Sequence, residues 1–85
     1  MGLFSKKKKI DYDELFKQKY KLINQIVQSA HDELDYDIKL ASLKLAVEKY
    51  DEIIELIDQG ANFDRQHFIA LKESVKKEIE LIQGV

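Results

Sequence analysis

Apolar side chains recur at steps of three and four residues through almost the whole chain, and no proline interrupts them. That spacing is the period of an amphipathic helix, and the absence of proline permits helices of many turns. The first series predicts one helix of about six turns, whose apolar face Leu15, Leu22 and Ile26 widen. Its members are Tyr12, Phe16, Tyr20, Ile23, Val27, Ala30 and Leu34.

A second apolar series has the same spacing, but it begins two residues after Leu34, where a continuous stripe needs a step of three or four. The phase of the helix therefore slips at this point. Residues 31–37 are rich in Asp and other residues that cap helices or form turns, which indicates a tight connection between two helices. The second series consists of Tyr36, Leu40, Leu43, Val47, Tyr50, Ile54 and Ile57.

Capping residues mark the helix ends. Asp11 fits an N-cap because Glu14 follows it three residues later. Gly60 fits a left-handed C-cap, and Asp64 fits the N-cap of a third helix. The third apolar stripe is narrower and consists of Phe68, Leu71, Val75, Ile79 and Ile82. We therefore expect helices at about 11–33, 36–59 and 64–83.

The fold class that these patterns favour is all-α, an antiparallel up-down-up three-helix bundle, because short connections make neighbouring helices antiparallel. The charges agree with this topology, since it sets an acidic middle helix between two basic flanks. The expected pairings are Lys17 and Lys21 with Asp51 and Glu48 on one side, and Lys72 and Lys76 with Glu52 and Glu48 on the other. The alternative is a long helical hairpin, or one helix over residues 12–59 that dimerises as a coiled coil.

The chain divides into a basic tail and an acidic body. Residues 1–9 are expected to be a flexible tail, and residues 10–85 a single helical domain. The tail lysines could touch an anionic membrane or nucleic acid, or they could merely aid solubility. With no cysteine and no apolar run near the 20 or so residues that span a bilayer, we expect a cytoplasmic protein, the inner membrane surface being the alternative place for the tail. The four tail lysines are Lys6, Lys7, Lys8 and Lys9.

Little in the sequence points to catalysis. The bundle places His31 and His67 at opposite ends, so we interpret both as surface or capping residues and not as metal ligands. A dense set of carboxylates is interpreted as a solvated helix face, because nothing apolar and concave is implied around it. We therefore expect no catalytic residue, no metal, no cofactor and no small-molecule substrate, and we do not expect an enzyme. The carboxylates are Glu48, Asp51, Glu52, Glu55 and Asp58.

The middle helix carries a second apolar face. Ile38, Ala41 and Leu45 project about 160° to 180° away from the main stripe of that helix. Either the third helix covers this face or another protein chain does. The sequence thus predicts a small interaction module, an adaptor or regulator that offers helix faces to a protein partner of unknown identity or to a second copy in a homodimer. The alternative function is a peripheral module that acts through its lysine tail.

Three short features are similar to those of another group of proteins. Met1-Gly2 is followed closely by a basic run, a polar helical stretch surrounds Gln18 and Gln25, and residues 44–50 read Lys-Leu-Ala-Val-Glu-Lys-Tyr. In these features, which lie within residues 1–60, the chain resembles the small YaaL-like proteins of Gram-positive bacteria. That family has no assigned activity or site residues, so the resemblance implies a bacterial source and nothing about chemistry.

Overall fold

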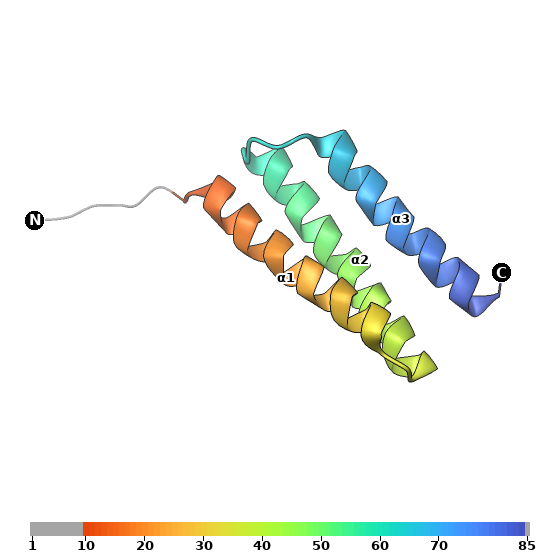
Figure 1. Ribbon diagram of the computed structural model, residues 1–85. Coiled ribbons are helices and arrows are strands. Elements are labelled where there is room, and N and C mark those ends of the chain that lie inside the picture. The colour runs from red at the N-terminus through yellow and green to blue at the C-terminus, as the bar shows by residue number, and fades with distance from the viewer. Residues whose placement is uncertain (1–9, 85) are drawn as a thin grey trace, which may run out of the picture.

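The computed structural model describes residues 10–84 and contains three helices within them. They are α1 (Tyr12–Asp32), α2 (Tyr36–Gln59) and α3 (Arg65–Gln83). The helices lie side by side and antiparallel, with α2 in the middle and packed against both neighbours (Figure 1). The predicted all-α three-helix bundle is confirmed. The alternative of one helix over residues 12–59 is wrong, because the chain reverses between α1 and α2.

Each helix begins at an aspartate. The carboxylate of Asp11 accepts a hydrogen bond from the backbone N–H of Glu14 at 3.0 Å, and Asp35 accepts one from that of Ile38 at 3.1 Å. Asp64 does the same for α3. These bonds satisfy N–H groups that a helix leaves without an intrahelical partner, which is why helices start at such residues. The predicted bounds of all three helices agree with the structure to within one residue at each end.

The end of α2 depends on Gly60, whose φ is 135°. That conformation is strained for a residue with a Cβ atom. It lets the N–H of Gly60 donate a hydrogen bond to the carbonyl of Ile57 at 3.1 Å. The N–H of Ala61 likewise donates to the carbonyl of Leu56 at 2.9 Å. The last carbonyls of α2 are thereby satisfied as the chain turns toward α3.

The core follows the predicted apolar stripes, with one clear exception. Leu34, placed by the spacing on the face of the first helix, is 98% exposed. The prediction is wrong there because α1 ends at Asp32 and the extended backbone at Glu33 carries Leu34 to the tip of the bundle. The buried residues are Phe16, Ile23, Ala30, Leu43, Ala46, Tyr50, Ile53, Ile54, Leu56, Ala61, Phe68 and Val75.

An aromatic cluster closes the end of the bundle where α1 begins. The rings of Phe16 and Phe63 stack with centroids 4.0 Å apart. Phe68 presents its edge to Phe16 at 4.8 Å and to Tyr20 at 5.2 Å. Offset-stacked and edge-on rings of this kind add to the free energy of area burial. The cluster thus joins α1 directly to α3.

At the opposite end, polar contacts at the surface tie α3 to both α1 and α2. Nε2 of His31 lies 2.8 Å from a carboxylate oxygen of Glu78. The hydroxyl of Tyr36, at the start of α2, donates to the carbonyl of Ile82 at 3.2 Å. Such exposed contacts are weak compared with buried rings, so these polar contacts add less to stability than the aromatic cluster does.

Candidate functional site

The predicted partner face on α2 is exposed. Ile38 keeps 52% and Leu45 keeps 42% of its surface open to solvent, and Ala41 is exposed as well. The possibility that the third helix covers this face is wrong. The reason is that α3 packs along a different edge of α2, the edge that carries Asp51 and Asp58.

A leucine of α1 borders the same face. Lys19 of α1 contacts Glu52 of α2 at 3.2 Å, which shows which edges of the two helices meet. Leu22 follows Lys19 by three residues, and Leu45 precedes Glu52 by seven, so in antiparallel helices both lie near this edge on the same side. Leu22 is 45% exposed. Leu22 belongs to the predicted apolar stripe of this helix, but a step of three or four residues cannot separate the rim of a stripe from its centre.

We name this surface the α1–α2 apolar face. It consists of Leu22, Ile38, Ala41 and Leu45. Scattered exposed apolar residues are normal on a soluble protein, but apolar residues gathered along one seam are typical of a contact surface. The face therefore offers apolar anchors on two adjacent helices.

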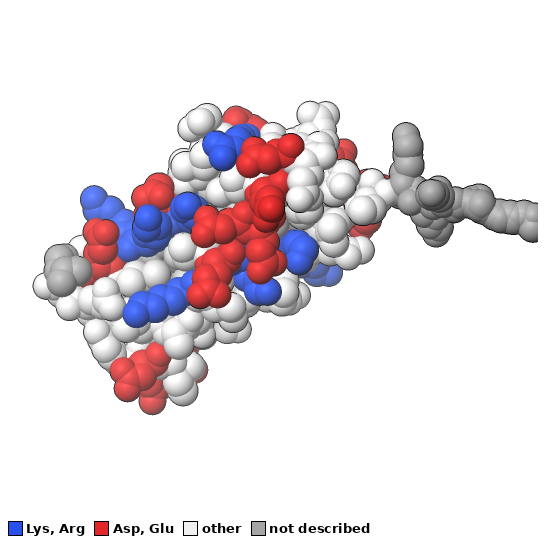
Figure 2. Space-filling view, turned by 180° about the vertical axis from the view of Figure 1, so that it is seen from behind, with Lys and Arg blue, Asp and Glu red and all other residues white. Residues whose placement is uncertain are grey.

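The acidic residues of α2 form a band along the middle of the face seen in Figure 2, with basic groups on its borders. On the α3 side, Lys72 reaches Asp51 at 3.0 Å and Arg65 reaches Asp58 at 2.9 Å. The acidic middle helix between basic flanks is thus present. Asp51, Glu52 and Asp58 are paired and partly solvated, and Glu48 and Glu55 are exposed, which agrees with the interpretation of these five carboxylates as a helix face.

The individual pairings differ from the expected ones. Lys72 pairs with Asp51 and not with Glu52. On α1, the lysine that reaches α2 is Lys19, whereas Lys17 and Lys21 form no ion pair within residues 10–84. At 100° per residue, Lys17 and Lys21 point away from α2 while Lys19 lies at its edge. A topology fixes the neighbouring helices, but it leaves the exact rotation of each helix open.

Glu52 is the carboxylate whose ionisation the structure perturbs. Burial alone would raise its pKa, but hydrogen bonds and the positive charges of Lys19 and Lys49 outweigh burial, so the pKa of Glu52 is lowered. Lys19 lies 3.2 Å and Lys49 3.4 Å from its oxygens. A carboxyl group held ionised in this way is suited to an ion pair and not to donating a proton at neutral pH.

The histidines lie apart, as the topology predicted. His31 is beside Glu78 near the end of α3, and His67 is beside Phe68 in the aromatic cluster, with ring centroids 5.0 Å apart. Across the described part of the chain, no three His, Cys, Asp or Glu side chains gather in a way that could hold a metal ion. Each histidine has a local partner that accounts for its position.

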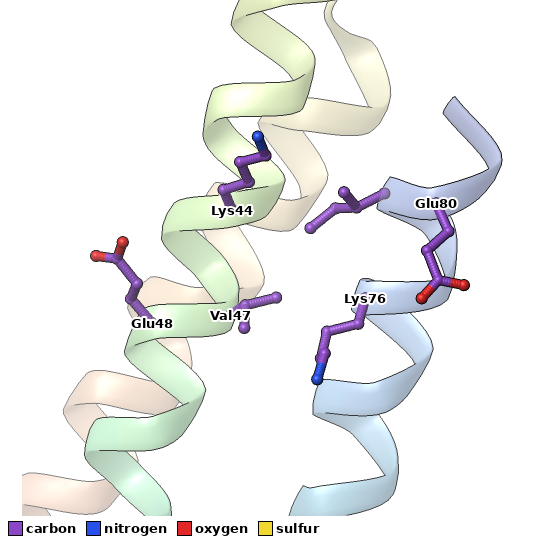
Figure 3. Close-up of a pocket in the computed structure, with 6 residues that line it drawn as sticks. Lys44, Val47, Glu48, Lys76 and Glu80 are labelled. Atoms are coloured by element: carbon purple, nitrogen blue, oxygen red, sulfur yellow. The ribbon is translucent and has the colours of Figure 1, made fainter. Parts of the chain in front are cut away.

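A groove lies between α2 and α3, which the apolar spacing of the sequence does not predict. It has a volume of about 400 Å³ and mixes two apolar residues with charges of both signs. Figure 3 shows that charged side chains rise from both helices around it, and that Val47 points into the space between them. Its lining residues are Lys44, Val47 and Glu48 of α2 and Lys76, Ile79 and Glu80 of α3.

The four tail lysines, Lys6 to Lys9, lie outside the described residues. No helix among residues 10–84 is long and apolar enough to cross a bilayer. Comparison of the chain with protein-family models, with curated proteins and with solved structures found no match.

Proposed function

We propose that this protein is a small helical interaction module, an adaptor or regulator, that binds a protein partner through the α1–α2 apolar face. The observation that supports this is the exposure of Ile38 and Leu45 on α2 next to Leu22 on α1. Covering apolar surface is worth about 25 cal/mol per Å², so a partner that covers the face gains free energy from it. The absence of cysteine in the whole sequence suits a reducing compartment such as the cytoplasm.

The partner best suited to this face is an amphipathic helix. Leu45 and Ile38 are seven residues apart on α2, two helical turns, and Leu22 lies on α1 about one turn from the level of Leu45. A helix laid along the seam would contact all three with apolar residues at steps of three and four. The charged rim, which includes Lys19 and Glu52, would then set its direction.

The test is Leu45→Lys, with Leu81→Lys as the matched control. Both changes replace an exposed leucine by lysine, but Leu81 lies on α3 and is 71% exposed. We expect both variants to keep the wild-type circular dichroism. In affinity capture from the source cells, the wild type and Leu81→Lys should retain a protein that Leu45→Lys loses.

Two results would contradict the proposal. One is a set of captured proteins that is identical for all three chains. The other is unfolding of the Leu45→Lys variant, which would show that Leu45 is needed inside the bundle.

A further inference from the structure

The seam between α2 and α3 is closed by ion pairs at one end. Arg65 lies opposite Asp58 at 2.9 Å, and two turns along, Lys72 lies opposite Asp51 at 3.0 Å. At both levels the acid is on α2 and the base on α3. The residue numbers rise along one helix as they fall along the other, as antiparallel neighbours require.

Further along the seam the ladder of charges continues, but it is not closed. The same register places Glu48 opposite Lys76, and then Lys44 opposite Glu80. All four line the groove, and within the described residues none pairs with another of the four. Lys76 instead contacts Glu73 of its own helix at 3.6 Å. The signs are reversed at the last level, where the base is on α2 and the acid on α3.

This arrangement of charges is complementary to itself. A two-fold axis that runs along the groove, parallel to the helices, lays α2 of one copy on α3 of the other at the same level. Glu48 then faces Lys76 of the second copy, and Lys44 faces Glu80 of the second copy. We propose that a second copy of this chain docks at the groove between α2 and α3, groove against groove, to form a symmetric homodimer.

Charge complementarity also selects this axis over the other one that a groove-to-groove dimer could use. An axis across the helices would lay α2 on α2. In two antiparallel helices the numbers of facing residues have a constant sum. When Lys44 faces Glu48 of the second copy, Glu55 therefore faces Asp37 of the second copy. Acidic groups directly opposite one another repel, so the axis along the groove is favoured.

The floor of the groove supplies the apolar contact. Val47 and Ile79 are half-buried, and the axis along the groove brings each against the other residue of the second copy. An apolar centre within a charged rim is the usual composition of a protein interface. Ala41 and Leu45 lie within one turn of Lys44 and Glu48 on the exposed side of α2, so a second copy docked at the groove would cover part of the α1–α2 apolar face. The two proposals can still be told apart, because the charge changes tested below leave that face unchanged, and Leu45→Lys leaves the four groove charges unchanged.

Two charge-swap variants test the docking. The α2 swap is Lys44→Glu with Glu48→Lys, and the α3 swap is Lys76→Glu with Glu80→Lys. In analytical ultracentrifugation, each swap alone should raise the dissociation constant of the dimer about tenfold or more, because like charges now meet. An equal mixture of the two should form a heterodimer about as tight as the wild-type dimer, because each swapped helix meets its complement.

The mixing step separates this interface from charge pairing within one chain. Pairing within one chain predicts no recovery on mixing, and the axis across the helices predicts that each swap dimerises by itself. Either result overturns the inference. So does a wild type that stays monomeric up to about 500 µM, because a dimer with a dissociation constant below the millimolar range would be detected at that concentration. The control, Lys17→Glu with Asp32→Lys on exposed positions of α1, should dimerise like the wild type.

Cross-linking gives a second measurement that needs only single substitutions. The chain has no cysteine, so Lys44→Cys and Glu80→Cys each provide one thiol. A short bismaleimide should link these two chains to each other when they are mixed. It should not link Lys44→Cys to Gln25→Cys, whose thiol is on the exposed side of α1. Equal linking of both mixtures would contradict the proposed geometry.

Discussion

The two ends of the bundle are held together by different means. At the end where α1 begins, Phe16, Phe63 and Phe68 interlock between the helices. At the other end, polar surface contacts such as that of His31 with Glu78 join α1 to α3, and the groove lies between α2 and α3. Fixed rings suit a structural role, whereas open apolar surface with unpaired charge suits binding. The aromatic rings thus gather at one end, while the groove and the exposed Ile38 lie toward the other.

The largest effect should come from Phe16→Ala. Phe16 is buried and packs against the rings of Tyr20, Phe63 and Phe68, so its removal leaves a cavity and should lower the free energy of unfolding by about 3–5 kcal/mol. The matched change at the open end is Ile79→Ala. Ile79 is half-buried in the groove, and its removal should cost about 1–2 kcal/mol. Urea denaturation measures both, and equal costs would remove the contrast between the two ends.

A smaller effect is expected from Gly60→Val, which disturbs the connection next to the aromatic cluster. At φ 135° a β-branched residue is strained, so the variant should lose about 1–2 kcal/mol. The space beside Gly60 is sufficient, since an added Cβ would lie 3.6 Å from Tyr12. Thermal denaturation checks this, and an unchanged Tm would show that the backbone there does not need glycine.

At the open end, Tyr36→Phe should have a still smaller effect. The variant loses the solvent-exposed hydrogen bond to the carbonyl of Ile82. Its free energy of unfolding should therefore fall by about 0.5 kcal/mol or less. Tyr12→Phe is the matched control at the aromatic end. A loss above about 1.5 kcal/mol, the upper value for a neutral hydrogen bond, would mean that this bond holds the open end firmly.

The smallest effect at neutral pH is expected from Tyr50→Phe, whose ring lies in the core. Burial, and then the nearby Tyr20, raise the pKa of the Tyr50 hydroxyl. In the unfolded chain that group ionises near pH 10, before it does so in the folded protein, so stability is kept below that pH and falls as the pH rises beyond it. Tyr50→Phe should remove part of this alkaline loss. Denaturation curves at neutral and alkaline pH measure the difference, and identical alkaline losses would contradict it.

Helix ends were the part of the fold most open to sequence reasoning. Asp11, Asp64 and Gly60 act through bonds to their own neighbours, so their residue types alone identify them. Leu34 shows the opposite case. Its spacing matched the core stripe, but burial depends on whether the helix reaches that far, which a spacing cannot tell.

The α1–α2 apolar face and the groove between α2 and α3 also differ in how far the sequence predicts them. Ile38, Ala41 and Leu45 were found from the sequence because they lie opposite the main stripe of a single helix. The groove needed the relative rotation of α2 and α3 and the sizes of the side chains between them. The sequence predicted an acidic helix beside a basic one. Which residues of the two helices face each other was known only from the observed contact of Lys72 with Asp51. The YaaL-like resemblance stays a prediction.

Each helix packs mainly against its neighbour along the chain, and this has a consequence for how fast the protein folds. Most contacts join residues that are close in sequence, and such topologies cross the folding barrier in microseconds to milliseconds. With no proline in the sequence, slow peptide-bond isomerisation cannot delay any molecule. A newly made chain should therefore fold within a small fraction of the time needed to synthesise it. The apolar residues of the core would then be exposed to solvent only briefly.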